Sequence, residues 1–177
     1  MNRRQFIAAS VSGGILIGIG SGYAWVNDGL DVNKLTIDNA LITLDNLADK
    51  TVTSTGQWNL YQIFSHAAQS VEYSMTGYPL HKSDTFKNTV GKLAFSAFST
   101  KGKMIHGLSE EIPGAPLFEK RDDAKGALLR LIQSLKDFQQ FAGELAPHFA
   151  YGVLSKDEYG LAHVMHLHNH FDEISIV

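Results

Sequence analysis

The sequence predicts an all-α fold, and three observations support this. Past Asp28 the apolar residues recur every three or four positions and almost never alternate, which is the period of an amphipathic helix. Glycine and proline interrupt this period at a few points, where helices are expected to end. The 177 residues are 44% apolar and 19% charged and show no repeat, so one domain spanning residues 28–177 is expected.

Residues 1–27 are predicted to be a targeting signal or an N-terminal anchor that precedes this domain. Arg3 and Arg4 come before an uncharged run from Gln5 to Val26, as in a basic region followed by an apolar one. The arginine pair with the apolar pair at 6–7 resembles a twin-arginine leader, whose export machinery would be a partner and would place the protein in the periplasm or cell envelope. An uncleaved anchor is the alternative, and no other membrane contact is expected.

Four apolar stripes predict the first four helices of the domain. Gly77 is expected to end the second helix, Gly102 the third and Pro147 the fourth. The stripes are Ile37, Leu41, Leu44 and Ala48; Leu60, Phe64, Ala67, Val71 and Met75; Phe86, Val90, Leu93 and Ala97; and Leu128, Leu131, Leu135, Phe138 and Ala142.

A fifth helix is predicted to begin after Ser155, which forms a capping box with Glu158. The longest irregular segment runs from about residue 101 to 121. Compact domains seldom contain so long a loop without a use, so a crossover between parallel helices, a lid, or both are expected.

Composition excludes several classes of function. The chain has no cysteine, so disulfides, thiolate metal sites, iron–sulfur clusters and a cysteine nucleophile are excluded. Because the first 27 residues hold two of the 15 basic side chains and no acidic one, the remainder has 13 basic against 18 acidic side chains. Such a surface repels phosphate, and no nucleic-acid partner is expected.

The histidines are the most informative feature of the sequence. Four of the eight lie within residues 163–170. On a helix, His163, His166 and His170 share one face, whereas His168 points nearly opposite. His166 and His170 are one turn apart and can therefore direct two imidazole nitrogens at one ion.

A third ligand is expected from another helix, and His66 is the best candidate because it lies inside the second helix. His66 is near the start of its helix and His170 near the end of the last one, so the two helices must be antiparallel. Three neutral imidazoles suit Zn, Ni, Fe or Cu divalent ions and leave positions open, with Zn and Ni favoured. A polar helix face without a metal is the alternative.

Other polar residues are assigned by their spacing from these histidines. His106, on the long loop, is kept as a pocket residue, and His148 is expected to be a surface or packing residue. His81 and His168 are predicted to face solvent. Side chains that could orient the ligands are Gln69, Ser70 and Tyr73 near His66, and Asn169 and Glu173 near the others.

Several blocks of the chain together resemble the DinB/YfiT-like superfamily, and within it a subgroup that is a domain of unknown function. The blocks are residues 66–79 (HAAQSVEYSMTGYP), 112–116 (IPGAP), 147–152 (PHFAYG) and 163–170 (HVMHLHNH), and the match spans roughly residues 31–174. The resemblance implies a four-helix bundle with up-down-down-up topology and an extra helix in the long crossover. It also implies metal ligation by His66, His166 and His170. The family pattern does not require His163, which helix geometry leaves as an alternative ligand paired with His166 or His170.

The resemblance implies an activity as well. Relatives transfer or isomerise using low-molecular-weight thiols, so the expected function is an exported metal-dependent enzyme with hydrolase or thiol-transferase chemistry on a small molecule. Glu72 or Tyr73 is a candidate proton carrier. The alternatives are a non-catalytic metal-binding protein of the envelope and a purely structural bundle. The sequence leaves the oligomeric state open, with a homodimer as one option.

Overall fold

The computed structural model of the chain describes residues 30–177, so the predicted signal or anchor at residues 1–27 lies outside the described part. This part is mostly helical, as predicted. Four of its helices, which lie alongside one another, are α3 (Ile37–Ala48), α4 (Leu60–Thr76), α7 (Ala124–Gln140) and α8 (Lys156–Phe171). No helix within residues 30–177 is both long and apolar enough to cross a membrane.

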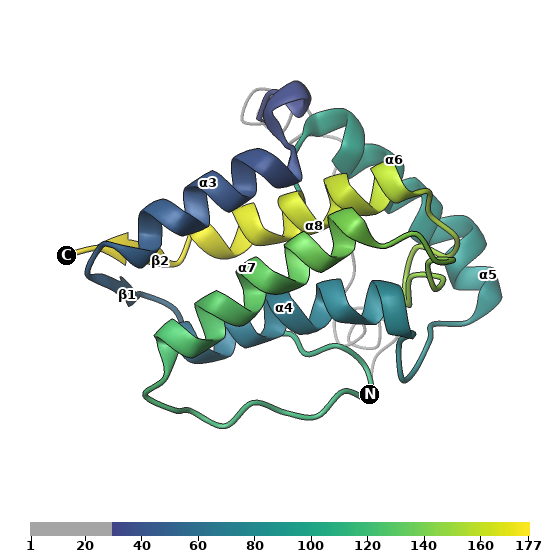
Figure 1. Cartoon of the computed structure of the whole chain (residues 1–177). Helices are drawn as coiled ribbons and strands as arrows, with labels where there is room; N and C mark the ends of the chain where they lie inside the picture. Colours follow the sequence, from purple (N-terminus) through teal and green to yellow (C-terminus); the bar gives the residue numbers. More distant parts are fainter. Residues whose placement is uncertain (1–29) are drawn as a thin grey trace, which may run out of the picture.

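The four helices run in opposing pairs. Figure 1 shows α3 and α8 running from right to left, and α4 and α7 running from left to right. The start of α4 and the end of α8 therefore lie at the same end of the molecule. This is the antiparallel arrangement that a site shared by His66 and His170 requires.

The core forms where α4 packs against α7, and the predicted stripes of these two helices face it. Phe64, Ala67 and Val71 are buried on α4, and Leu131 and Leu135 are buried on α7. Burying each of these larger side chains contributes about 1.5–3 kcal/mol. This packing fixes α4 relative to α7. It therefore also fixes the direction in which α4 presents His66.

The predicted end of α7 is wrong. The helix stops at Gln140, before Ala142 and well before Pro147, because Phe141 takes an extended backbone with φ −65° and ψ 118°. Lys156 donates to the carbonyl oxygens of Gln139 and Phe141 at 2.8 and 2.7 Å. A cation from the start of α8 therefore stabilises the carboxyl end of α7.

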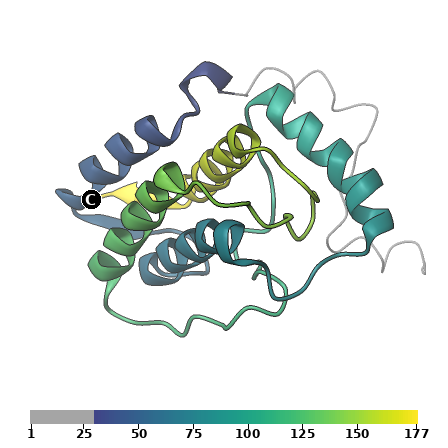
Figure 2. The same ribbon diagram turned by 45° about the vertical axis from the view of Figure 1, so that its right-hand side comes forward.

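The third predicted helix exists, but its buried face differs from the predicted stripe. It comprises α5 (Asp84–Phe86), the π-helical η2 (Lys87–Gly91) and α6 (Lys92–Lys101), and it lies to one side of the other four helices (Figure 2). Val90 and Leu93 are 45% and 73% exposed, whereas Phe95 and Phe98 are buried. The buried positions Gly91, Ala94, Phe95 and Phe98 still recur every three or four residues, but one position out of step with the predicted stripe, so the stripe was placed on the wrong face.

A two-stranded antiparallel sheet corrects the all-α prediction. Strand β1 (Val52–Ser54) precedes α4 and β2 (Ile174–Ile176) follows α8, with Val52 opposite Ile176. Three residues are too few for an alternating pattern to be read from the sequence. The sheet joins the chain before α4 to the chain after α8, which holds together the helix ends that carry the histidines.

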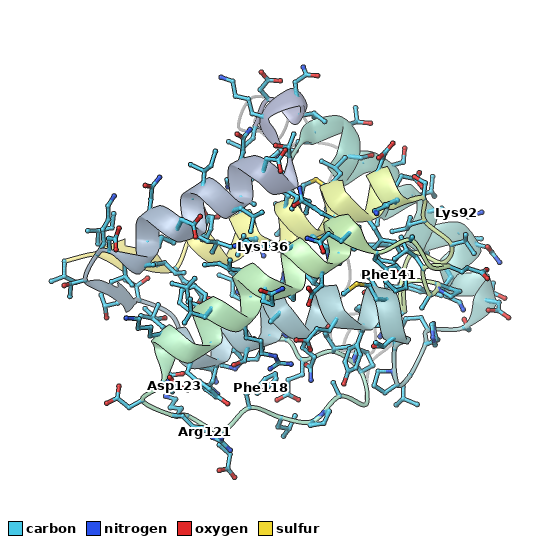
Figure 3. The ribbon with its side chains drawn as sticks, in the orientation of Figure 1. Lys92, Phe118, Arg121, Asp123, Lys136 and Phe141 are labelled. Atoms are coloured by element: carbon cyan, nitrogen blue, oxygen red, sulfur yellow. The ribbon has the colours of Figure 1, made fainter. Side chains whose placement is uncertain are left out.

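Residues 102–123 form the long connection between α6 and α7 and contain no regular helix or strand, as predicted. Gln62 donates to the carbonyl oxygen of Phe118 at 2.7 Å, and Asn59 donates to that of Arg121 at 3.1 Å. The Phe118 ring also lies 5.7 Å from the Arg130 guanidinium. In Figure 3 Phe118 and Arg121 lie below the start of α7, near Asp123, so the loop is held against the first turns of α4 and α7.

Candidate metal centre

Three histidines from α4 and α8 converge at one point. The ligand atoms offered by His66, His166 and His170 all lie within 4.8 Å of one another. The Nε2 atoms of His66 and His166 are 3.1 Å apart. Two nitrogens bound to one ion at about 2.0–2.1 Å are separated by about 2.9–3.4 Å for angles between a right angle and the tetrahedral angle. The observed spacing therefore fits two ligands of a common ion.

His170 is oriented by an acidic partner. Its Nδ1 lies 3.1 Å from Oε1 of Glu173, and both side chains are buried. A carboxylate accepts, so Nδ1 carries the hydrogen and Nε2 carries the lone pair. Within residues 30–177 this buried Nε2 has no hydrogen-bond partner. A buried lone pair without a protein partner is what a metal ligand is expected to present.

Burial keeps the three imidazoles neutral. Desolvation, with His106 as a weaker cause, lowers the pKa of His66 to about 3. Desolvation and the neighbouring histidines lower the pKa of His170 to about 2 and hold the pKa of His166 well below its usual value. Neutral imidazole is the form that binds metal, so the lone pairs are available at neutral pH.

The long loop brings a fourth histidine to this group. The centroid of the His106 ring lies 4.7 Å from that of His166 and 5.1 Å from that of His170. Its separation from the His66 ring is 6.5 Å. Sequence reasoning kept His106 as a pocket residue because the loop returns to this end of the molecule, and the structure places it there.

Trp58 covers the histidines and was missed by sequence reasoning. Its ring stacks on His170 with centroids 6.2 Å apart and planes 9° apart, and meets the edge of His66 at 5.0 Å. Trp58 precedes α4, so no helical period links it to the site.

Trp58 also lines two hollows. One is a cavity of about 20 Å³ beside His66 and Gln69, with room for about one water molecule. The other is an open cleft of about 340 Å³ that includes Lys120 and Arg121. The indole therefore stands between the histidines and the open cleft.

A comparison with protein families places the chain. The model of a family described as "Protein of unknown function (DUF1569)" matches residues 27–175. The chain belongs to this family. Searches of curated proteins and of solved structures gave no match. The DUF1569 match covers the helices of residues 30–177 and the histidine group described above.

The structure places the remaining histidines of the DUF1569 domain away from the group. Nε2 of His163, the alternative ligand, lies 3.2 Å from Ser74 Oγ, and its ring packs against Phe138. His148 is buried with its ring 4.3 Å from that of Tyr151, so it is a packing residue as predicted.

Two histidines had been predicted to face solvent. His81 is exposed, as predicted. His168 is half-buried, with its ring 5.4 Å from that of Phe171, so the prediction of a solvent-facing side chain was too simple.

The predicted proton carriers and orienting residues of the DUF1569 domain have different surroundings. Both oxygens of Glu72 accept from Arg130, at 2.8 and 2.6 Å. The Tyr73 hydroxyl lies 3.5 Å from Nε2 of Gln69, which lines the small cavity. Asn169 donates to the carbonyl oxygen of His106 at 3.4 Å, so it anchors the loop.

Proposed function

We propose that the protein is a metal-dependent enzyme that holds a divalent ion, Zn or Ni by preference, through His66, His166 and His170. The observation that carries this proposal is the state of His170. Its Nδ1 donates to Glu173 while its Nε2, aimed at the group, is buried and, within residues 30–177, without a partner. A histidine that only packs usually has its polar atoms satisfied.

The chemistry follows from an ion with open positions. When bound, such an ion supplies Lewis-acid activation of water or of a thiol, which suits hydrolysis or thiol transfer on a small molecule. Glu173 holds His170 in one orientation, and Trp58 shields the histidines from solvent on the side of the open cleft. A thiol would come from a cosubstrate, because the chain has no cysteine.

Of the two proton carriers that the sequence offered, we propose only one. We retain Tyr73, whose hydroxyl contacts Gln69 beside the cavity. We leave out Glu72, because Arg130 binds both of its oxygens. Helix geometry agrees, since Glu72 is about 120° around α4 from His66 whereas Tyr73 is about 20° away.

The proposal extends to the fold. We interpret α3, α4, α7 and α8 as an up-down-down-up four-helix bundle, with α5, η2 and α6 as the extra helix within the crossover. The opposing pairs in Figure 1 and the resemblance of the four sequence blocks support placing the chain in the DinB/YfiT-like superfamily. In such bundles a metal site is built from side chains on facing helices.

Metal counting tests the proposal. The full chain, purified from metal-replete medium, is expected to contain about one divalent ion per chain by elemental analysis, in line with a single site of three imidazoles. The His166→Ala, His170→Ala double variant is expected to lose it. His168→Ala, on the same helix but outside the group, is the matched control and should keep it. Equal metal contents in wild type and double variant would contradict the proposal.

One observation favours a second function, a metal-binding protein of the cell envelope without catalysis. The cavity beside His66 holds only about 20 Å³, so the site is closed to a substrate in this conformation. Adding imidazole or azide to the cobalt-loaded chain separates the two functions. An enzyme is expected to show a shifted visible spectrum as the ligand reaches the ion, and a closed store is expected to show none.

We also propose that residues 1–27 direct export through the twin-arginine route. Arg3 and Arg4 followed by an uncharged run support this. Fractionation of cells that express the full chain is expected to find it in the envelope or periplasm, and Arg3→Lys, Arg4→Lys is expected to retain it inside. Unchanged export of the double variant would contradict this route.

A further inference from the structure

We propose that His106 is a fourth protein ligand of the metal centre, supplied by the loop at residues 102–123. This inference rests on the proposed function, and it adds a residue to the three that the resemblance implies. Three observations carry it: the hydrogen-bond state of the His106 ring, its position relative to the other rings, and the way the loop backbone is anchored beside them.

The His106 ring is in the same state as that of His170. Its Nδ1 lies 2.9 Å from the carbonyl oxygen of Gly107. A carbonyl oxygen only accepts, so Nδ1 carries the hydrogen and Nε2 carries the lone pair. This Nε2 is buried and, among residues 30–177, has no hydrogen-bond partner. His106 and His170 therefore both present a buried, unpartnered lone pair at the same place.

The ring centroids have spacings close to those of four rings around one ion, with His66 and His106 on opposite sides. A ring bound through Nε2 has its centroid about 3.2 Å from the ion, so two rings are about 4.5–5.2 Å apart when adjacent and about 6.4 Å apart when opposite. His106 lies 4.7 and 5.1 Å from His166 and His170, and 6.5 Å from His66. The pairs among the other three are 5.0–5.3 Å apart.

The loop is anchored on both sides of this ring. Asn169, next to His170 on α8, donates to the carbonyl oxygen of His106 at 3.4 Å. Met104 and Ile112 are 5% and 4% exposed, so the flanking segments are packed into the protein. His106 is outside the group of atoms within 4.8 Å of one another, so its coordination requires a small inward shift of the loop when the ion binds. Binding of the ion is thereby coupled to this inward shift of the loop.

Counting imidazoles on a bound cobalt ion tests this inference. In the full chain loaded with Co²⁺, each coordinated histidine whose Nδ1 keeps its hydrogen gives one strongly shifted, exchangeable proton signal. We expect four such signals for wild type, three for His106→Ala and His106→Gln, and four for the exposed control His81→Ala. Chelator competition is expected to show Zn²⁺ affinity about tenfold or more lower in both His106 variants, at least the effect of losing an outer partner.

Each outcome decides one question. Cobalt binding with three signals in wild type, unchanged by His106→Ala, overturns the inference and leaves the three-histidine centre standing. Failure of the wild-type chain to bind cobalt overturns the proposed function and this inference together. Circular dichroism of both His106 variants checks their fold, and the two substitutions, one apolar and one polar, separate loss of the ligand from disturbance of the loop.

Discussion

Two groups of buried and half-buried histidines pack against or lie on α8, and they differ in what their nitrogens contact. The first, which we call the ligand cluster after the role proposed above, lies at the carboxyl end of the helix and comprises His66, His106, His166 and His170. The packing cluster, nearer the helix start, comprises Ser74, Tyr78, His148, Tyr159 and His163. Both are aromatic-rich, and burial lowers the histidine pKa values in both.

The difference is in hydrogen bonding. In the packing cluster, Nε2 of His163 contacts Ser74 Oγ, and Nδ1 of His148 accepts from the amides of Ala150 and Tyr151 at 3.1 and 3.2 Å. In the ligand cluster, Nε2 of His106 and of His170 have no partner within residues 30–177. Residue type is therefore the same in the two clusters. What differs is that two of the four rings in the ligand cluster leave a buried Nε2 without a partner within residues 30–177, while Nε2 of His66 and of His166 face each other at 3.1 Å.

The largest difference between the two clusters is expected in how their variants change the stabilisation of the fold by zinc. With Zn²⁺ at about 1,000 times its Kd, the free energy of unfolding of the full chain should rise by about 4 kcal/mol, because the ion binds only the folded state. The His166→Ala, His170→Ala variant should not respond. Urea unfolding with zinc and with a chelator measures this. A zinc response in the double variant would place the ion elsewhere.

Removing the central side chain of the packing cluster should have the opposite signature. His163→Ala deletes the contact with Ser74 and leaves a cavity against Phe138, so the free energy of unfolding should fall by about 2–4 kcal/mol. The metal content should stay that of wild type. Urea unfolding and elemental analysis on the same preparation check both, with exposed His81→Ala as the control. Loss of metal in His163→Ala would show that metal binding depends on the packing cluster as well as on the ligand cluster.

A smaller effect is expected from the partner that orients His170. Glu173→Gln keeps the shape of the side chain but removes the charge that holds the Nδ1 hydrogen, so zinc affinity should fall by about 10- to 100-fold. Chelator competition measures this, and Glu72→Gln, whose carboxylate is paired with Arg130 outside the ligand cluster, is the matched control. Equal losses in both variants would show that general charge, and not orientation, sets the affinity.

The last prediction concerns the pH dependence of stability, where the effect over any one pH unit is small. Burial lowers the pKa of His163 and of His148 to about 3, below the 6.5 of an exposed histidine. The folded state thus favours the neutral ring, and this stability is fully present above pH 6.5 and is lost as pH falls from 6.5 toward 3. In metal-free protein, His163→Gln should flatten this dependence by about 1.4 kcal/mol per pH unit. If the free energy of unfolding of wild type and of His163→Gln changes in parallel from pH 6.5 to 4.5, His163 is excluded as a cause of the pH dependence.

Local signals in the sequence predicted the parts of the fold that depend on local contacts. Ser155 and Glu158 form the predicted capping box, and Gly77 and Gly102 follow the helices they were expected to end. The π turn at 87–91 escaped prediction, because no change in composition marks it. The same holds for β1 and β2, whose pairing depends on residues about 120 positions apart.

The candidate site divides in the same way. The spacing of His166 and His170 on one helix face identified a pair, and the need for a third ligand from another helix led to His66, a choice that required antiparallel helices. His106 could be placed only loosely, because an irregular loop has no period from which a direction can be read. Trp58 could not be found at all, since its contact with His170 depends on how the chain enters α4.

The sequence distance across the site also sets the order in which the protein can mature. His66 and His166 are 100 residues apart, and Thr55 bonds to the carbonyl of Glu173 across 118 residues. At about 5–20 residues per second, a ribosome takes roughly 5–20 s to add the second half of the site after the first. Under the proposed function, metal capture therefore follows the synthesis of His170 and of the segment after it.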